Sequence, residues 1–425
     1  MRLSILYKYT LFLAGVFACI SSQVKANDLS VEFSGFATLS MSYSDDSDIG
    51  FSSNYLNESE TGFSFSRDSI LGGQANITIN NNWDAVVQGI YQDRSAKYFN
   101  NFLELAFIRY RPQRNWIIRA GRMNSDLFLL SEYPYVGYAY LWARPPHAYY
   151  SFASTAGHYD GVDVEYNNQI DDGFLRVKLA LGTTTPKLTA GDEQLTITFD
   201  DLYILSAVYI KDEWTFRAAT SKSDVSNFES MPFNTLIDSL NTIAPSNIWP
   251  QAAHFARGFE HQHHSINYSA LGLAYDNANW LIQAEAGKTK SDWMVVPSNN
   301  SGYVSVGYRV NEMTYFGGLS IAKNKKNTPE IVTPESLAYL PEAVQYATTE
   351  LIEVTEYAVK RTIVDQKNVN VGAKWYYSDK VVFKVQADHF IIEPTGGGLW
   401  DIAPELGIDV EHNVNLISFS ASLVF

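Results

Sequence analysis

The last thirteen residues of the chain, after His412, alternate between apolar and small polar side chains. From Ile417 onward every second residue is apolar up to Phe425, and Ser418, Ser420 and Ser422 stand between them. A period of two places successive side chains on opposite faces of a strand. The apolar face ends on an aromatic residue with no charge to close it. The pattern therefore favours a strand with lipid outside and water inside over the half-buried last strand of a soluble domain.

The same alternation recurs along the whole chain. It begins in residues 29–44, where Leu, Val, Phe and Met alternate with Ser, Glu and Thr, and it continues in seven hairpins. The hairpin strands are predicted at residues 71–80 and 83–91, 102–111 and 116–122, 161–166 and 173–182, 201–210 and 214–220, 266–275 and 280–288, 302–310 and 314–322, and 368–377 and 380–389. With residues 413–425 at the end, the chain is predicted to have sixteen strands.

Short and long connections alternate strictly between these strands. The long ones are residues 45–68, 93–101, 123–160, 183–200, 221–265, 289–301, 323–367 and 390–412. Short turns at one rim, long loops at the other and an even strand number are typical of an outer-membrane β-barrel. The predicted fold class is therefore all-β: a sixteen-stranded antiparallel transmembrane barrel, with short periplasmic turns and long extracellular loops.

Four tryptophans hold equivalent positions in this scheme. Trp83, Trp116, Trp214 and Trp280 each stand first after a short turn. Tryptophan favours the membrane interface, where the ring is in an apolar layer and its N–H stays wet. The four are predicted to form a periplasmic aromatic girdle. Capping of hairpins in a soluble protein is the plainer interpretation, but it does not explain why the loops segregate by length.

The N-terminus is typical of a secretory signal peptide. Arg2 and Lys8 precede a short apolar core, and a small-residue site ends at Ala26. Residues 1–26 are predicted to be cleaved, which leaves residues 27–425 as the barrel. The one cysteine, Cys19, lies inside the apolar core, so the mature chain would have no disulfide. A lipid anchor on Cys19 is the competing interpretation.

The overall composition excludes several classes of function. The formal net charge is −15, which disfavours nucleic-acid binding. After the N-terminus no stretch is apolar for eighteen residues, which argues against helical membrane spans. Neither an activated nucleophile nor a phosphate-binding or metal motif is recognisable, so neither an enzyme nor a cofactor is predicted. His261, His263 and His264 are close together, but they are more typical of a solvated loop than of a zinc or copper site.

Taken together, these features resemble the Gram-negative general porins, which are trimeric sixteen-stranded barrels. The resemblance covers residues 27–425 and rests on architecture rather than on one motif. It implies a location in the outer membrane, contact with its lipid, a homotrimer, and a water-filled pore that passes small hydrophilic solutes. It also implies that residues 123–160 fold into the lumen as the third loop, and that the barrel-assembly machinery reads Phe425 near the periplasmic rim.

Alternation predicts which charges face such a lumen. Arg109 and Arg119 are expected to point inward from adjacent strands, as is Arg176, while Arg122 and Arg144 flank the third loop or lie in it. Lys178, Arg217, Lys374 and Lys384 follow by the same parity. A basic wall of this kind resembles the porin constriction, with Asp126, Glu132 and Asp160 as the facing loop acids. Ordinary solvation of a wet lumen is the plainer alternative, and the short acidic-glycine motif of the best-known porins is absent.

The third and seventh loops leave alternatives open. Residues 123–160 hold seven tyrosines, which could guide sugars or aromatic solutes or could pack the loop against the wall. After Pro341, apolar residues at helical spacing predict a loop helix that packs on the barrel mouth. The alternatives to a general diffusion pore are therefore a substrate-selective channel and a plugged surface barrel that acts as an adhesin or receptor.

Overall fold

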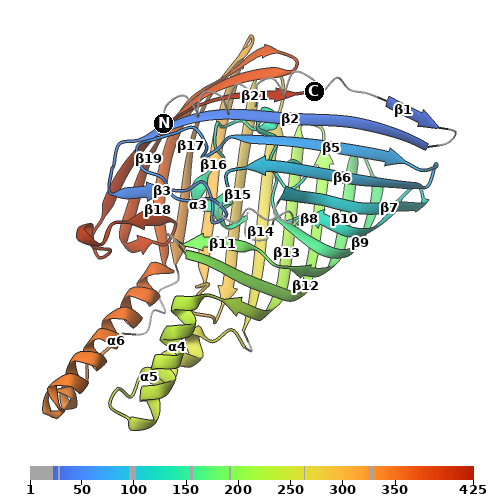
Figure 1. The fold of residues 1–425 in the computed structure, drawn as a ribbon. Coiled ribbons are helices and arrows are strands. Elements are labelled where there is room, and N and C mark those ends of the chain that lie inside the picture. The colour runs from blue at the N-terminus through green and yellow to red at the C-terminus, as the bar shows by residue number, and fades with distance from the viewer. Residues whose placement is uncertain are drawn as a thin grey trace.

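The computed structural model of the protein describes residues 23–26, 29–94, 102–153, 157–190, 193–262, 264–324 and 330–425. Within these residues the chain forms one closed antiparallel barrel (Figure 1). Its sixteen strands, in order round the wall, are β2 (Leu29–Ser44), β5 (Ile70–Thr78), β6 (Trp83–Gln92), β7 (Leu103–Gln113), β8 (Trp116–Asn124), β9 (His158–Ile170), β10 (Gly173–Thr184), β12 (Glu193–Lys211), β13 (Trp214–Glu229), β14 (Ser265–Asp276), β15 (Trp280–Ser291), β16 (Asn299–Val310), β17 (Met313–Asn324), β18 (Val364–Ser378), β19 (Val381–Gly397) and β21 (His412–Val424).

Pairing between the first and last of these strands closes the wall. β2 pairs with β5 on one side and with β21 on the other, where Phe36 lies opposite Val424 and Ser44 opposite Leu416. Closure leaves no unpaired strand edge for lipid to meet. All sixteen predicted strands are present, so the predicted fold class is confirmed.

The two faces of the wall differ as alternation requires. On β21, Ile417 and Phe419 are 57% and 44% exposed on the outer face, whereas Ser418, Ser420 and Ser422 of the inner face are each 1% exposed. Leu205, Leu271 and Val371 continue the apolar exterior on other strands. An outward apolar band of this kind suits a lipid environment. The buried inner serines show that something other than water covers them.

The short turns are stabilised by asparagine side chains. Asn80 Oδ1 accepts from the backbone N–H groups of Asn82 and Trp83 at 2.9 and 3.1 Å. Asn277 makes the same pair of bonds with Asn279 and Trp280. These Asx turns reverse the chain within a few residues and place a tryptophan at the start of the next strand.

The predicted fourth long loop, residues 183–200, is wrong in extent. β10 continues to Thr184, β12 begins at Glu193, and a short strand β11 (Lys187–Ala190) pairs with β12 between them. The strands can extend beyond the membrane because Leu195 and Ile197 turn inward and pack with Trp293. Alternation alone cannot reveal such an extension once polar residues dominate the outer face.

Several smaller elements lie near the long-loop rim. β3 (Ile49–Phe51) of the first loop pairs with β20 (Trp400–Ile402) of the eighth, and η5 (Pro404–Leu406) follows β20. β4 (Phe63–Ser64) pairs with β2. At the chain start, β1 (Gln23–Ala26) pairs with β2 as well. The rest of the predicted leader, residues 1–22, lies outside the described residues, and cleavage remains a prediction.

Three helices project from the long-loop rim, away from the barrel (Figure 1). They are α4 (Met231–Ile243) and α5 (Ala252–Phe259) of the fifth loop and α6 (Glu342–Arg361) of the seventh, with the short turns η3 (Ala244–Ser246) and η4 (Glu335–Tyr339). The predicted helix after Pro341 is confirmed, but it packs its Ile352 and Val359 with α4 and α5 rather than lying only on the mouth. No helix in the described part of the chain is long and apolar enough to cross a membrane.

Candidate functional site

The connection between β8 and β9 lies inside the barrel. This segment, residues 125–157, is called loop 3 below; residues 154–156 of it are not described. It carries the 3₁₀ turn η1 (Gly137–Ala139) and the helix α3 (His147–Ala153), which contacts β16, β17 and β18 from within. Loop 3 therefore crosses the lumen rather than standing at its mouth (Figure 1).

Loop 3 is hydrogen-bonded to strands on widely separated parts of the wall. Each bond joins an inward wall side chain to a loop group: Leu129 N to Glu285 Oε2 at 2.8 Å on β15, Trp142 Nε1 to Ser305 Oγ at 3.0 Å on β16, Ala143 N to Gln386 Oε1 at 3.0 Å on β19, and Arg144 Nη2 to Ser418 Oγ at 3.2 Å on β21. Bonds in several directions hold the loop in one position across the lumen.

The aromatic residues of loop 3 pack against the inner wall. Trp142 and Tyr149 meet Tyr303 edge to face, with ring centroids 5.6 and 5.4 Å apart. Phe128 lies 5.5 Å from Tyr268 of β14. With Leu141 and Phe316 they form an apolar core inside the barrel. The structure thus places these aromatic rings in packing contacts, as expected for a loop that folds inward.

A group of basic side chains surrounds Asp126 at the start of loop 3. Arg217 of β13 donates to its carboxylate, Lys178 Nζ of β10 lies 3.2 Å away, and Ser206 Oγ of β12 donates at 2.7 Å. Burial alone would raise the pKa of Asp126, but Lys178 and Arg217, with Arg176, outweigh it and hold that pKa well below its usual range. Asp126 therefore remains negatively charged among these basic side chains.

The second predicted loop acid meets the same wall. Glu132 accepts from Arg176, whose guanidinium also lies 3.9 Å from Asp126. The structure therefore brings together three predicted residues, Arg176, Asp126 and Glu132, at one side of the lumen. Lys178 and Arg217, which parity placed inward, complete this charged group.

Arg109 and Arg119 lie opposite each other in register on β7 and β8. Their partners are acids of neighbouring strands rather than of loop 3. Arg109 Nε donates to Asp84 of β6 at 2.8 Å, and Arg119 Nη2 donates to Asp163 of β9 at 2.7 Å. Arg111 also donates to Asp84, so one carboxylate serves two guanidinium groups there, whereas Asp163 serves Arg119. The sequence pattern gave no signal for these pairings because it does not show which strand ends are level.

The assignment of Arg122 and Asp160 to the lumen is wrong. The two residues are paired across β8 and β9, with Arg122 Nη2 2.7 Å from Asp160 Oδ2. Ile118 on the same face of β8 and Val162 on the same face of β9 are 39% and 49% exposed on the outer wall. Residues separated by an even number share a face of a strand, so this ion pair lies outside the barrel.

Arg144 fastens loop 3 to the first loop and to β21. Its Nε donates to Asp68 of the first loop at 2.9 Å, and its guanidinium lies 4.7 Å from the ring centroid of Phe51. The neighbouring His147 has Nε2 2.9 Å from the Ser52 carbonyl, and Gln366 Nε2 lies 3.1 Å from its Nδ1. Together they bind the middle of loop 3 to loop 1 and to β18.

Two wall lysines bind backbone carbonyls of loop 3. Lys374 Nζ donates to the carbonyls of Tyr138 and Tyr140 at 2.7 and 3.1 Å, and Lys384 Nζ donates to that of Trp142 at 2.7 Å. Parity placed both lysines inward, but sequence reasoning missed their partners. A backbone carbonyl has no side-chain signature that would have revealed the contact.

Comparison with solved structures identifies the architecture. The fold matches the outer-membrane channel DcaP of Acinetobacter baumannii over 96% of this chain and all of that one, with 12% identity and a TM-score of 0.53. It matches OmpF of Salmonella typhi over 95% and 100%, with 11% identity and a TM-score of 0.53. It matches an anion-selective porin from Comamonas acidovorans over 93% of this chain and all of that one, with 9% identity and a TM-score of 0.50. The chain has the fold of the outer-membrane porins.

Sequence comparisons add no family assignment to the porin fold. No family model matches the chain, and no curated protein does.

The predicted girdle residues all lie on the outer face of the porin barrel. Trp83, Trp116, Trp214 and Trp280 are each about two-fifths exposed. Each packs on a tyrosine of the next strand, with ring centroids 4.4–4.8 Å apart: Trp83 on Tyr110, Trp116 on Tyr166, Trp214 on Tyr275 and Trp280 on Tyr308. The aromatic pairs thus join neighbouring hairpins at the short-turn rim.

Phe425 continues the pairing of the closing strand. Its backbone exchanges two hydrogen bonds with Gly35 of β2, at 2.8 and 3.0 Å. Its ring covers Gly35 so closely that a Cβ there would overlap it. The terminal residue is therefore part of the seam that closes the porin wall.

Within the described part of the chain, the histidines of the fifth loop do not form a metal site. His264 Nδ1 lies 3.0 Å from Asp292 Oδ1, and its Nε2 lies 3.3 Å from the Arg257 carbonyl. His263 lies outside the described residues. In the described ranges no group of three or more His, Cys, Asp or Glu side chains is placed to hold a metal ion.

Proposed function

We propose that this protein is an outer-membrane diffusion channel of a Gram-negative bacterium, with loop 3 as its narrowest part. Small hydrophilic solutes and ions would pass down their gradients between the loop and the charged wall, without a catalytic step or a cofactor. The apolar exterior, the closed barrel and the porin fold support a channel that sits in outer-membrane lipid.

The observation that carries this proposal is a series of adjoining cavities through the barrel. An upper cavity of about 250 Å³ and a middle one of about 170 Å³ share Ser125 and Phe128 in their linings. The middle cavity shares Pro134 and Tyr135 with a lower one of about 280 Å³, which reaches Phe425. Small movements of loop 3 would join these cavities into one path.

The middle cavity would set the selectivity of such a path. Arg67, Asp68 and Arg144 line it, with His147 and Ser131. Charges of both signs at a narrow point orient dipolar solutes and exclude large ones. Since loop 3 fills much of the section, the proposed pore is narrow and its conductance small.

Two partners are proposed with the channel. A homotrimer is supported by the porin fold and by OmpT of Vibrio cholerae, which shares that fold at a TM-score of 0.50 and is described in a trimer form. Recognition of the C-terminal strand by the barrel-assembly machinery is supported by the position of Phe425 at the seam.

Planar-bilayer recording of the purified chain tests the channel. We expect stepwise currents, and a shift of the reversal potential toward cations in Arg67→Ala, because the middle cavity then loses a positive charge and keeps Asp68. Arg122→Ala is the matched control, since that arginine lies on the outer face and should leave selectivity unchanged. Equal reversal potentials in the wild type and Arg67→Ala would contradict a role for the middle cavity in selectivity.

A plugged surface barrel that acts as an adhesin or receptor is the second candidate. The many bonds between loop 3 and the wall, and the helices that project from the long-loop rim, favour it. Under this alternative the same bilayers would carry no current at any voltage that leaves the membrane intact. Sealed barrels would therefore exclude the channel.

A further inference from the structure

The inner face of β12 is apolar where a wet lumen calls for polar side chains. Five inward residues of this strand are at most 8% exposed: Leu195, Ile197, Phe199, Leu202 and Ile204. Their outward neighbours at the loop end are Thr196, Thr198 and Asp200. The usual pattern, apolar outside and polar inside, is therefore reversed over the upper part of this strand.

A local irregularity keeps these apolar residues on one face. The register between β12 and β13 shifts between Asp200 and Tyr203, and Asp201 has a positive φ of 47°. A bulge of this kind adds a residue without turning the strand, so Phe199 and Leu202 can both point inward. The bulge therefore keeps the apolar stripe on the inner face of β12.

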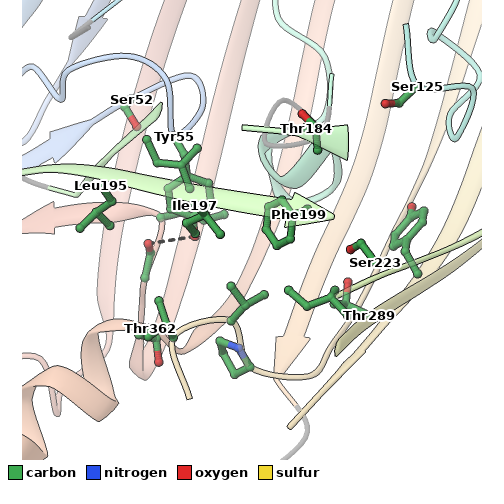
Figure 2. A pocket seen from close by; sticks show the side chains of 18 of the residues that line it. Ser52, Tyr55, Ser125, Thr184, Leu195, Ile197, Phe199, Ser223, Thr289 and Thr362 are labelled. Carbon is green, nitrogen blue, oxygen red and sulfur yellow. Dashed lines mark hydrogen bonds between the residues drawn. The ribbon is translucent and has the colours of Figure 1, made fainter. Parts of the chain in front are cut away.

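The stripe forms one side of the upper cavity, shown in Figure 2. Leu195, Ile197 and Phe199 lie along one strand in this view, with Tyr55 beside them. The floor is Leu127 and Phe128 of loop 3, and other sides come from Val295, Leu399 and Trp400. A well-packed core contains few voids larger than a water molecule, so a cavity of about 250 Å³ exceeds what packing requires.

Two buried polar atoms face the junction of the upper and middle cavities. Ser125 and Asn57 line both cavities and are 2% and 6% exposed. Among the described residues, neither Ser125 Oγ nor Asn57 Oδ1 has a hydrogen-bond partner. A buried polar atom without a partner costs free energy, so a ligand that supplies a donor here would bind more tightly.

The charged groups at the cavity edge are already paired. Arg361 Nη1 donates to the Trp400 carbonyl at 2.6 Å, and its Nη2 donates to Asp401 at 3.3 Å. A charged ligand would therefore find no free counter-ion among the described residues that line this cavity. The lining suits an uncharged ligand.

We propose that the upper lumen is a binding site for an uncharged, mainly aromatic or aliphatic small molecule with one hydrogen-bond donor. The apolar body lies against β12, and the donor reaches Asn57 Oδ1 or Ser125 Oγ. An apolar cavity of about 150 Å³ is large enough for a benzene ring, so this one admits a bicyclic compound. The inference deepens the proposed function by naming a class of solute, and it rests on that function for the passage of the solute beyond loop 3.

Equilibrium dialysis of the purified full chain in detergent tests the site, with indole as the probe and protein-free micelles as the blank. Indole is uncharged and carries one N–H, and 1-methylindole lacks that donor. We expect saturable binding of one indole per chain, and binding weaker by about two- to tenfold for 1-methylindole. Asn57→Leu combined with Ser125→Ala should remove this preference for indole.

A pair of matched variants tests the location. Ser223→Trp places a large side chain into the cavity from β13, whereas Ser226→Trp adds the same bulk on the exposed face of that strand. We expect Ser223→Trp to weaken indole binding more than tenfold and Ser226→Trp to leave it unchanged. Equal binding by both variants, or no saturable binding by the wild type, would overturn the site.

The outcomes separate this inference from the proposed function. Conductance without Ser223-dependent binding would retain the channel and reject the site. Ser223-dependent binding by a barrel that carries no current would retain the site and reject the channel.

Discussion

The small polar residues of the inner wall make room for loop 3. Thr38 of β2 donates to or accepts from Ser422 of β21 at 2.9 Å, and a Cβ on Gly137 of the loop would overlap Thr38. Larger side chains at these positions would push the η1 turn away from the wall. Alternation assigns the serine-rich face to water, but part of this face is covered by loop 3.

Gly35→Ala is expected to weaken the closing seam. The new methyl group would overlap the Phe425 ring, and overpacking of this kind costs about 1–3 kcal/mol. Because the ring is at the chain end and can move, the lower part of this range is expected. The measurement is urea unfolding of the chain folded in lipid vesicles, with tryptophan fluorescence as the signal.

Gly73→Ala provides a matched control for that experiment. Gly73 lies opposite Gly35 in register on β5, yet a Cβ there meets no atom within 4 Å. The control should unfold at nearly the wild-type urea concentration. If the two variants lose the same stability, contact with Phe425 is not the cause.

The helix α3 begins at a titratable residue, His147, whose ring helps to hold it in place. Burial, and then Arg144 beside it, lowers the pKa of His147 to about 3. The Gln366 amide lies 3.1 Å from Nδ1 and donates to it when the ring is neutral. Protonation would remove that acceptor and place a second positive charge next to Arg144.

The docking of α3 is therefore expected to weaken in acid. A released His147 titrates near pH 6.5, so the docked state is fully stable above about pH 6.5. As the pH falls from there toward 3, the released state binds the proton and docking loses up to about 1.4 kcal/mol per pH unit. Hydrogen exchange of residues 147–153, corrected for the intrinsic pH dependence, should show protection falling over this range.

His147→Gln separates this effect from other titrations. Glutamine can donate to the Ser52 carbonyl and accept from Gln366, but it does not titrate in this range. Protection of residues 147–153 should then vary little between pH 6.5 and 4. An equal loss in the variant would assign the pH dependence to other groups.

The whole molecule is a barrel whose interior is partly occupied by its own chain. Strand pairing forms the wall, loop 3 packs against its inner face, and β3 and β20 pack with α3, β19 and β21 near the long-loop rim. A channel of this form conducts only as far as loop 3 allows. The substrate-selective alternative is therefore the form of the proposed channel that the upper cavity favours.

Assembly of three copies is expected at this scale. In a closed three-fold ring, one pair of complementary outer patches repeats at all three contacts. Native mass spectrometry of the detergent-purified chain should give three copies per complex, and channel closures in bilayers should come in threes. A monomer that conducts in single steps would contradict the trimer and leave the channel proposal intact.

Much of the architecture could be predicted because a membrane barrel imposes a simple rule on sequence. Lipid on one side and an interior on the other require alternation, and each Asn-Trp turn marks where a strand begins. Three features follow from this local rule: the sixteen strands, the inward direction of Arg109 and Arg119, and the outward direction of the four tryptophans. The rule did not predict strand ends such as Glu193 of β12, because these ends extend beyond the membrane.

The contents of the barrel were decided by the tertiary structure. Alternation tells which face a side chain is on, but it does not tell what meets it there, because partners in the lumen come from distant parts of the chain. Asp163 opposite Arg119, loop carbonyls at Lys374 and Lys384, and the pairing of Arg122 with Asp160 outside the wall all depend on register. The sequence alone thus determined a closed sixteen-stranded wall with an apolar exterior. Long-range packing of loop 3 decided how much of its interior is left for a solute.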